Sequence, residues 1–288
     1  MRNQAVAGKI LSVLLRTGFI QGLLSNPTKM TITPMHFIRL ILLFTFFLNF
    51  NQVFAQKGVA TTFSTIDALL AGLYEGTFTV KELKQRGNFG IGTFHSLNGE
   101  LLMLNGKVYQ IQADGSSQEV QDTTRIPWAT VSFFQEGQQH HLPDDLTYTS
   151  FQKEMDKVLA SPNLSYAIWV EGVFSIKVRS VPAQTKPYPK MTQIVDQQSV
   201  FNYQNIRGTL VGFRSPAYVK GINIPGFHLH FLSADGKRGG HVLDFIMERG
   251  TVQTEKYHEL SLVLPTNKAF LEVDLVTDKT KDLQQVEK

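Results

Sequence analysis

The chain has 288 residues, of which 42% are hydrophobic, and this is enough for a sizeable folded core. Its net charge of +4 comes from the first 55 residues, which hold five Lys and Arg and no acidic residue. The remainder carries 23 basic and 24 acidic residues and therefore lacks the basic surplus that favours nucleic acid as a partner. Cysteine is absent, which excludes disulfides and thiolate metal sites.

The start of the chain has the pattern of an export signal. From Met35, a short basic segment with Arg39 precedes an apolar run and a small residue, Ala55. This pattern predicts a secretory signal peptide over residues 35–55, behind an upstream extension over residues 1–34 that a start codon assigned too early would explain. Because the apolar run is short for a bilayer span, we expect no membrane association after signal removal, and a periplasmic or extracellular mature protein.

Behind the leader, helical spacing and turn signals follow in order. STIDALLAGLYEG places apolar residues at helical spacing behind a Ser64 or Thr65 cap and predicts a helix ending at Gly76. Three Asn-Gly or Asp-Gly pairs between residues 98 and 115 predict an antiparallel hairpin meander. A second helix is predicted over residues 144–159.

The rest of the chain is predominantly β-prone. A long strand is predicted over residues 166–181, then a Pro-rich connection over residues 182–191, then short strands and turns that end in KAFLEVDL and a charged tail. Because strands outnumber helices and come in neighbouring runs, we expect an α+β, β-rich fold with mixed or antiparallel sheets and a few packed helices. Its two parts are a β-rich half, residues 56–180, and a metal-binding half, residues 181–288.

Three of the eight histidines fall within GFHLHFLSADGKRGGH, residues 226–241. Alternate residues of a strand share a face, so His228 and His230 project side by side. SADGKRGG predicts a turn, and the strand after it places His241 on the same face, opposite or diagonal to His230. Asp244 would point away from this group. Three neutral imidazoles with an open position suit zinc or a similar divalent ion at a catalytic site on a C-terminal β-hairpin.

Together with three further stretches, this segment resembles the alpha-acetolactate decarboxylase family from about Ser64 to the end of the chain. The stretches are GNFGIGTFHSLNGELLMLNGKVYQ, VRSVPAQTKPYP and LVLPTNKAFLEVDL, in the family's order. The resemblance implies a carboxy-lyase that converts (S)-2-acetolactate, a small-molecule substrate, to (R)-acetoin and carbon dioxide. It also implies a zinc ion and a homodimer, since members commonly pair through their sheets.

The resemblance extends to individual site residues, with Leu101 in place of a common Met as a change that should be tolerated. Glu100 matches a Glu that reaches the metal site, and Glu287 matches a second active-site Glu near the carboxyl end. The implied catalytic residues are Thr93, Glu100, Arg179 and Glu287, and the implied zinc ligands are His228, His230 and His241.

These residue types suit the implied reaction. Loss of carbon dioxide leaves an enediolate, which a zinc ion would stabilise as a Lewis acid. Arg179 would pair with the substrate carboxylate or with the developing negative charge. Glu100 or Glu287 would protonate one face of the enediolate, and the sequence does not choose between them.

Two other interpretations remain open from the residues. A cupin-like metal oxygenase also uses His-x-His on a strand and a later His, although Ala234 and Asp235 stand where that pattern needs a Glu. A non-enzymatic secreted module could bind metal through the same face. The remaining histidines, His95, His140, His141 and His258, are predicted to be surface or loop residues.

Overall fold

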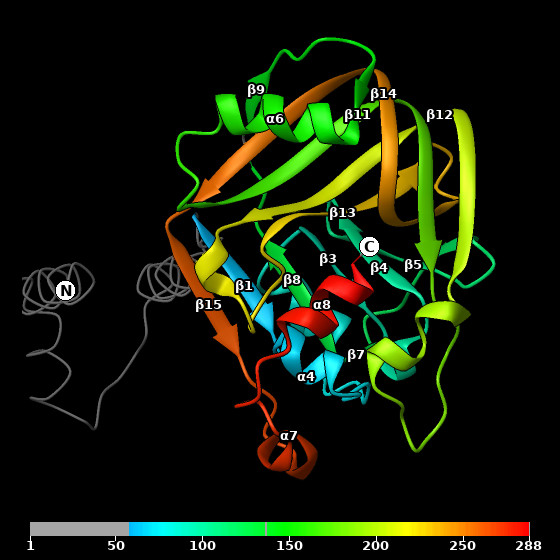
Figure 1. The fold of residues 1–288 in the computed structure, drawn as a ribbon, viewed down its shortest axis with the longest axis vertical. Coiled ribbons are helices and arrows are strands. Elements are labelled where there is room, and N and C mark those ends of the chain that lie inside the picture. The colour runs from blue at the N-terminus through cyan, green and yellow to red at the C-terminus, as the bar shows by residue number, and fades with distance from the viewer. Residues whose placement is uncertain (1–57, 136, 288) are drawn as a thin grey trace, which may run out of the picture. The chain divides into compact units, whose positions relative to one another are not determined.

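Residues 58–135 and 137–287 are described by a computed structural model, shown in Figure 1. The predicted extension, residues 1–34, and the predicted signal peptide, residues 35–55, lie outside these ranges. Over the described residues, two large β-sheets are accompanied by short helices. The predicted β-rich class, with mixed and antiparallel sheets and few helices, is confirmed.

The first sheet is mixed. In spatial order its strands are β15 (Glu259–Val263), β1 (Val59–Phe63), β8 (Trp128–Ser132), β3 (Phe89–Thr93), β4 (Glu100–Leu104), β5 (Lys107–Ile111) and β6 (Ser117–Glu119). The end strand β15 runs parallel to β1, and the other neighbours are antiparallel. The run β3 to β6 is the predicted meander, and its Asn105-Gly106 turn has the positive φ angles of a tight hairpin.

The second sheet is antiparallel. Its strands in spatial order are β10 (Leu146–Thr147), β14 (Gly239–Tyr257), β11 (Ser165–Ser180), β12 (Ser199–Ser215) and β13 (Gly226–Ser233), and β9 (Gln138–His140) also pairs with β14. Because β13 pairs with the first residues of β14 as well as with β12, the strands β14, β11, β12 and β13 close into a ring. The predicted histidine hairpin is the β13–β14 pair of this ring.

One feature of the second sheet differs from the expectations. The prediction of short strands after residue 191 was wrong for β12 and β14, which run for 17 and 19 residues because each pairs with β11 along its length. Each predicted half contributes to both sheets: β11 lies inside the second sheet, and β15 returns to the edge of the first. The described residues belong to one compact unit.

The first helix begins at one of its two expected caps. Helix α4 (Ile66–Leu70) starts behind Thr65, whose hydroxyl accepts from the backbone N–H of Ala68 at 3.2 Å. It ends before the expected Gly76, because Gly72 has a φ of +97° and turns the chain away from the helix axis. Helix α6 (Tyr148–Val158) lies inside the predicted range, and α5 (Val80–Lys84) was not predicted.

The C-terminal segment is helical where strands and turns were expected. Within KAFLEVDL, α7 (Lys268–Glu272) forms behind Asn267, whose side chain accepts from the N–H of Phe270 at 3.0 Å. The last helix is α8 (Thr280–Val286). The remaining short elements are η1 (His95–Leu97), η2 (Met191–Gln193), η3 (Val195–Gln197), η4 (Ala217–Val219), and the ribbon of β2 (Phe78–Thr79) and β7 (Arg125–Ile126).

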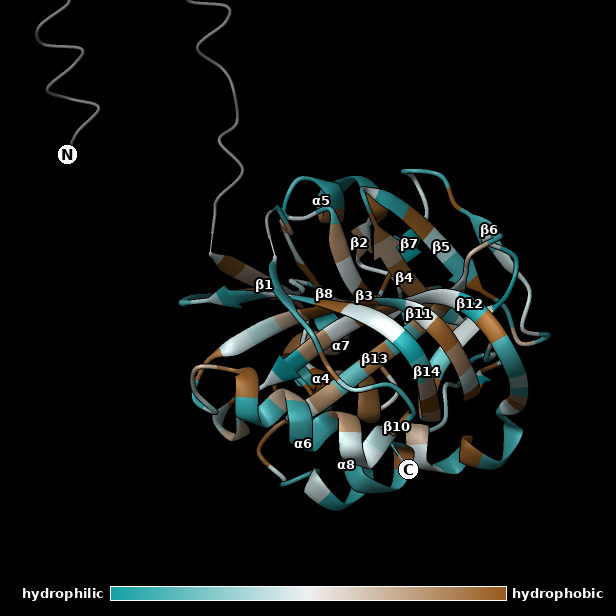
Figure 2. Cartoon of the chain, turned by 90° about the horizontal axis from the view of Figure 1, so that it is seen from above, coloured by the Kyte–Doolittle hydropathy of each residue, from teal (hydrophilic) through white to brown (hydrophobic). Residues whose placement is uncertain are grey.

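Apolar side chains hold the two sheets together. Phe89 and Ile91 of the first sheet pack with Val211 and Phe213 of the second, and α6 covers the other face of the second sheet. Figure 2 shows hydrophobic residues concentrated on strands such as β3 and β4. None of the described helices is both long and apolar enough to cross a lipid bilayer.

Candidate metal centre and active site

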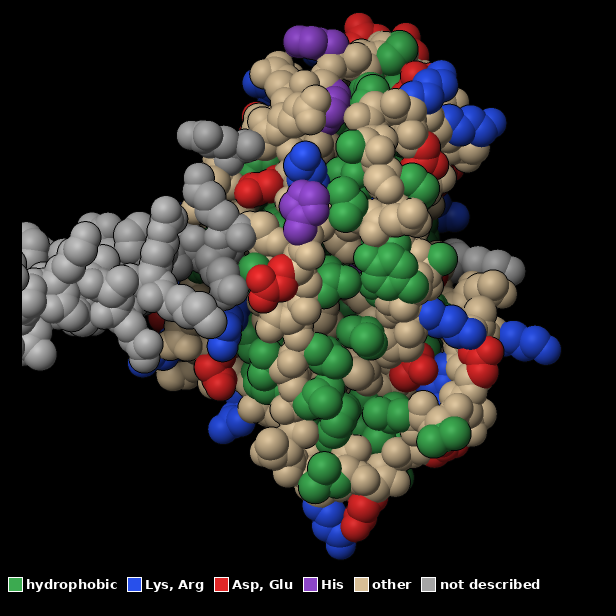
Figure 3. Space-filling model, turned by 90° about the vertical axis from the view of Figure 1, so that its left-hand side faces the viewer, with side chains coloured by type: hydrophobic (Ala, Val, Ile, Leu, Met, Phe, Trp, Pro, Cys, Tyr) green, Lys and Arg blue, Asp and Glu red, His purple; other side chains and the backbone are tan. Residues whose placement is uncertain are grey.

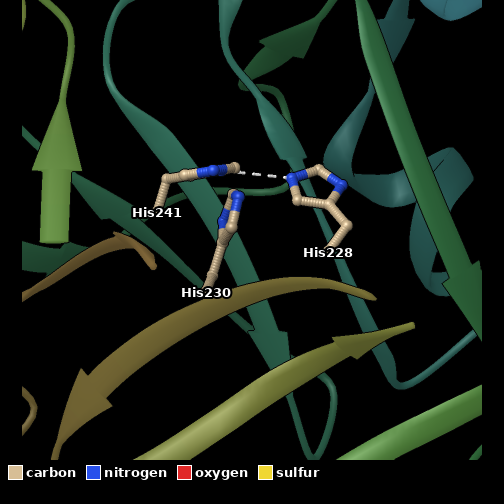
Figure 4. Close-up of side chains that lie close together, drawn as sticks. All are labelled: His228, His230 and His241. Carbon is tan, nitrogen blue, oxygen red and sulfur yellow. Dashed lines mark hydrogen bonds between the residues drawn. The ribbon is translucent and has the colours of Figure 1, made fainter. Parts of the chain in front are cut away.

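The three histidines come from the hairpin of β13 and β14 and turn towards one another (Figure 4). His230 lies directly opposite His241 in the strand register, and His228 lies two residues earlier on the face of His230. One potential ligand atom of each imidazole lies within 4.8 Å of the others. All three side chains are buried. The structure therefore brings together the three residues that the spacing singled out.

The nitrogen atoms of this cluster suit a metal ion. Nδ1 of His230 lies 2.8 Å from the Leu101 carbonyl, which can only accept, so this nitrogen carries the proton and Nε2 keeps a free lone pair. Nε2 of His230 and Nδ1 of His228 have no hydrogen-bond partner in the described residues. Nε2 of His228 lies 3.2 Å from Nδ1 of His241, close to the roughly 3.3 Å between two ligands of a tetrahedral zinc ion.

Burial keeps the imidazoles neutral. It lowers the pKa of His230 to about 3, with the nearby Arg179 adding to the effect and the Leu101 hydrogen bond opposing it. The pKa values of His228 and His241 are also well below their usual value because of burial and the neighbouring positive charges. Neutral imidazole is the form that binds a metal, so the cluster is prepared to donate at physiological pH.

Arg179 stands next to this cluster on β11, directly opposite His241 in the register. Its side chain is 6% exposed and lies between two carboxylates: Nη1 is 3.5 Å from Glu100 and Nη2 is 3.6 Å from Glu287. Nη2 also donates to the Val286 carbonyl at 3.1 Å, while Nε has no partner among the described residues. The guanidinium is a planar cation with an N–H group still available, so it can donate a hydrogen bond to an anionic substrate.

The two carboxylates connect the arginine to the histidines. Glu100 lies 3.7 Å from Nε2 of His230, and Glu287 lies 3.6 Å from Nε2 of His241. Burial raises the pKa of Glu100 to about 7, with Arg179 opposing the rise and Glu287 adding to it. Burial also raises the pKa of Glu287, again against Arg179. A pKa of about 7 allows Glu100 to hold and release a proton near neutral pH.

Thr93 ends β3 directly opposite Glu100, and its hydroxyl donates to the Gly99 carbonyl at 2.7 Å. Gly99 has a φ of +81°, and a Cβ at this position would lie 2.2 Å from the Ile111 carbonyl oxygen. The close approach therefore requires glycine. The Thr93 hydrogen bond and the close contact of Gly99 together hold the turn before β4. They therefore fix the position of Glu100, the first residue of β4.

A cavity of about 40 Å³ lies between these groups. The polar lining consists of the predicted site residues and Gln198. The apolar lining was not predicted as part of the site, and it comprises Ile66, Leu69, Leu97, Trp128, Val181, Met191, Ile224 and Val286. The Trp128 indole stacks on His228 with ring centroids 5.9 Å apart. No sequence signal marked Trp128, because a buried strand position and a cavity wall require the same apolar residue types.

The comparison with known proteins covers most of the chain. The sequence profile described as alpha-acetolactate decarboxylase matches residues 61–277. The chain belongs to this family. Membership makes the protein an enzyme of the carboxy-lyase class and disfavours the cupin-like and non-enzymatic interpretations.

Family relatives agree over comparable lengths. The alpha-acetolactate decarboxylase of Methanosarcina mazei is 45% identical over 226 residues, which is 78% of either chain, and that of Bacillus subtilis is 39% identical over 78% of this chain and 89% of its own. A crystal structure of the Bacillus subtilis enzyme matches with a TM-score of 0.78 and 38% identity over 80% of this chain and 99% of that chain. A Staphylococcus aureus structure, described as a protein of unknown function similar to alpha-acetolactate decarboxylase, matches with a TM-score of 0.75 and 30% identity over 79% of this chain and 98% of that chain.

The remaining histidines lie outside the family site, with one difference from expectation. His140 was predicted at the surface, but it is only 7% exposed on β9, and its Nε2 lies 2.8 Å from the Thr254 hydroxyl. The pairing of β9 with β14 covers the ring. His95 is partly exposed, and its Nδ1 accepts from the N–H of Gly76 at 3.0 Å.

Proposed function

We propose that this protein decarboxylates (S)-2-acetolactate to (R)-acetoin and carbon dioxide, with a zinc ion held by His228, His230 and His241. Family membership supports the substrate and the reaction. The observation that carries the metal assignment is the set of three buried, neutral imidazoles with converging nitrogen atoms. When bound, zinc supplies Lewis-acid polarisation of a substrate oxygen.

Arg179 binds the substrate carboxylate in this proposal. Its Nε, which has no partner among residues 58–135 and 137–287, and its fork between Glu100 and Glu287 leave it able to bind an incoming anion. During the reaction the bond between the carboxylate carbon and the carbinol carbon breaks, and its electron pair moves into the neighbouring carbonyl. Arg179 then stays beside the negative charge that has moved to the former carbonyl oxygen.

Glu100 or Glu287 returns the proton to carbon. Both carboxyls have raised pKa values, and they approach the histidine cluster from two different elements, β4 and the end of α8. A proton delivered from one fixed direction reaches one face of the enediolate, which gives a single enantiomer of acetoin. The Glu287 side chain is 22% exposed and can regain a proton from solvent. Thr93 holds the turn that places Glu100.

The test is an assay of the purified chain from Gln56 onwards with racemic 2-acetolactate. We expect acetoin and carbon dioxide in equal amounts, with the R enantiomer of acetoin dominating on a chiral column. A zinc-loaded protein that leaves acetolactate unchanged would refute the proposed reaction. Consumption of oxygen with the same substrate would point to an oxygenase.

We also propose a homodimer that forms through the first sheet. Leu260, Leu262 and Leu264 are between 39% and 48% exposed on and just after the edge strand β15. Figure 3 shows hydrophobic side chains gathered on the side of the molecule that carries β15. An unpaired edge strand with exposed leucines is a surface that a second copy can cover. Light scattering should give twice the chain mass, and Leu262→Lys should shift it to the monomer.

We further propose that the protein is exported. The basic start, apolar run and small residue of residues 35–55 support this proposal. Fractionation of expressing cells should place the protein in the periplasm or the medium, with an amino terminus at or near Gln56. A protein that stays in the cytoplasm with residues 35–55 attached would contradict it.

A further inference from the structure

The candidate active site is too small for the proposed substrate. Its cavity of about 40 Å³ has room for about three water molecules, because each needs roughly 10–15 Å³ of such volume. 2-Acetolactate has nine non-hydrogen atoms and is about three times larger than that. Part of the wall must therefore move before the substrate can reach Arg179 and the histidines.

The wall that is least firmly attached is α8, the last helix. It is seated by two apolar side chains, Leu283 and Val286, which are 9% and 2% exposed in a cluster with Ile66, Leu69 and Met191. Its polar attachments are the Val286 carbonyl, which accepts from Arg179, the Gln285 amide, which donates to the Thr192 carbonyl at 3.4 Å, and the adjoining Glu287 carboxylate, which lies 3.6 Å from both Arg179 and His241. Few contacts therefore oppose a local opening of this end of the chain.

The segment that leads into α8 is held by surface contacts, such as the ion pair of Lys220 with Asp278 at 2.9 Å, which is exposed and therefore weak. Helix α7 buries none of its own residues, Leu271 on it is 72% exposed, and Val276 after it is 97% exposed. In Figure 1, α7 projects away from the sheets. The connection from β15 to α8 is thus a tether along the surface, and a hinge there would disturb no core packing.

The other walls are held more firmly. Most of the remaining lining residues belong to strands that are paired on both sides, such as Thr93, Trp128 and His241. The segment before η2 is fixed to its neighbours by Gln184, whose N–H donates to the Ser96 carbonyl at 2.7 Å, and by Tyr188, whose hydroxyl lies 2.8 Å from that of Ser96.

We infer that α8 is a hinged cap over the site, and that Leu283 and Val286 are positioning residues that seat it and so place Glu287 beside Arg179 and His241. This inference rests on the proposed function for the identity of the substrate. Opening admits acetolactate and withdraws Glu287. Closing returns this carboxyl to the site and excludes water around the bound substrate.

The inference can be tested by locking the cap. The chain has no cysteine, so Thr192→Cys with Gln285→Cys introduces the only two thiols, next to the 3.4 Å contact between α8 and η2. A short bismaleimide should join them and hold α8 closed. We expect the linked protein to keep its zinc content and to lose at least about ten-fold in kcat/KM for acetolactate.

Matched controls separate locking from damage. In the same double variant, N-ethylmaleimide modifies each cysteine separately and adds a group of similar chemistry without joining α8 to η2. This protein should stay active. A bismaleimide between Lys268→Cys and Glu272→Cys, one turn apart on α7, should also leave turnover unchanged. Undiminished kcat/KM in the protein linked across α8 would overturn the cap. An unmodified protein that is inert with zinc bound would instead refute the proposed function.

A second variant reports on the cap without turnover. Leu283→Ala removes one of the two seating side chains and should favour the open state by roughly 30-fold or more. The backbone amides of Leu283 and Glu287, which donate to the carbonyls of Lys279 and Leu283, should then exchange with deuterium faster by about that factor. The exposed-site control Leu271→Ala should leave their exchange unchanged. Equal exchange in both variants would show that α8 is a fixed wall.

A third variant tests the same role through turnover. Leu283→Met should recover most of any kcat lost in Leu283→Ala, because the Met side chain fills the apolar site that Ala leaves empty. Lack of recovery would contradict the role of Leu283 in positioning α8.

Discussion

Replacing Arg179 by Ala separates substrate binding from metal binding. The guanidinium contacts no histidine at hydrogen-bond distance, so His228, His230 and His241 should retain one zinc per chain. The variant loses the cation that faces the substrate carboxylate, a charge-assisted interaction worth about 2–4 kcal/mol. We therefore expect kcat/KM for acetolactate to fall by roughly 30-fold to 1000-fold.

The assay is acetoin formation at several substrate concentrations, with zinc measured in the same samples. Arg249→Ala, an exposed arginine on β14, is the control and should behave like the unmodified protein. Arg179→Lys should recover only part of the rate, because Lys keeps the charge but not the planar fork. Loss of zinc together with activity, or kcat/KM within about three-fold of the unmodified value, would refute the role of Arg179.

Three further predictions concern the metal, the turn and a buried histidine. His228→Ala removes one of three protein donors, and dialysed protein should fall from one zinc per chain towards none, as metal analysis will show. Gly99→Ala forces a Cβ against the Ile111 carbonyl and should destabilise the protein by about 1–3 kcal/mol in urea unfolding while lowering kcat through a displaced Glu100. Burial lowers the pKa of His140, so the unfolded chain binds this proton first, and stability should decline as pH falls below about 6.5; His140→Gln should lose less between pH 7.5 and pH 5.

Local patterns predicted the hairpin of the site well. His-x-His on a strand, a turn sequence and a third histidine fix which side chains share a face, because the period of a strand is two residues. His230 and His241 accordingly lie opposite each other. The Asn105-Gly106 turn and the Thr65 cap were readable for the same reason, since each depends on residues next to it in the chain.

Long-range contacts were not readable from local patterns. For Glu100 and Glu287, only the family resemblance indicated a place in the site. Their approach to Arg179 depends on β4, β11 and α8 meeting in space, and no local signal encodes that meeting. The lengths of β12 and β14 escaped prediction because partner strands extend them. The α7 helix was missed although its residues, KAFLE behind the cap Asn267, favour a helix.

The central claim is that the three imidazoles hold a zinc ion on which turnover depends. Its most direct measurement is acetoin formation by protein stripped with a chelator, before and after titration with zinc. We predict no acetoin above the uncatalysed rate in the stripped protein, and recovery that is complete at one zinc per chain. Full turnover by protein that contains no metal would contradict the account.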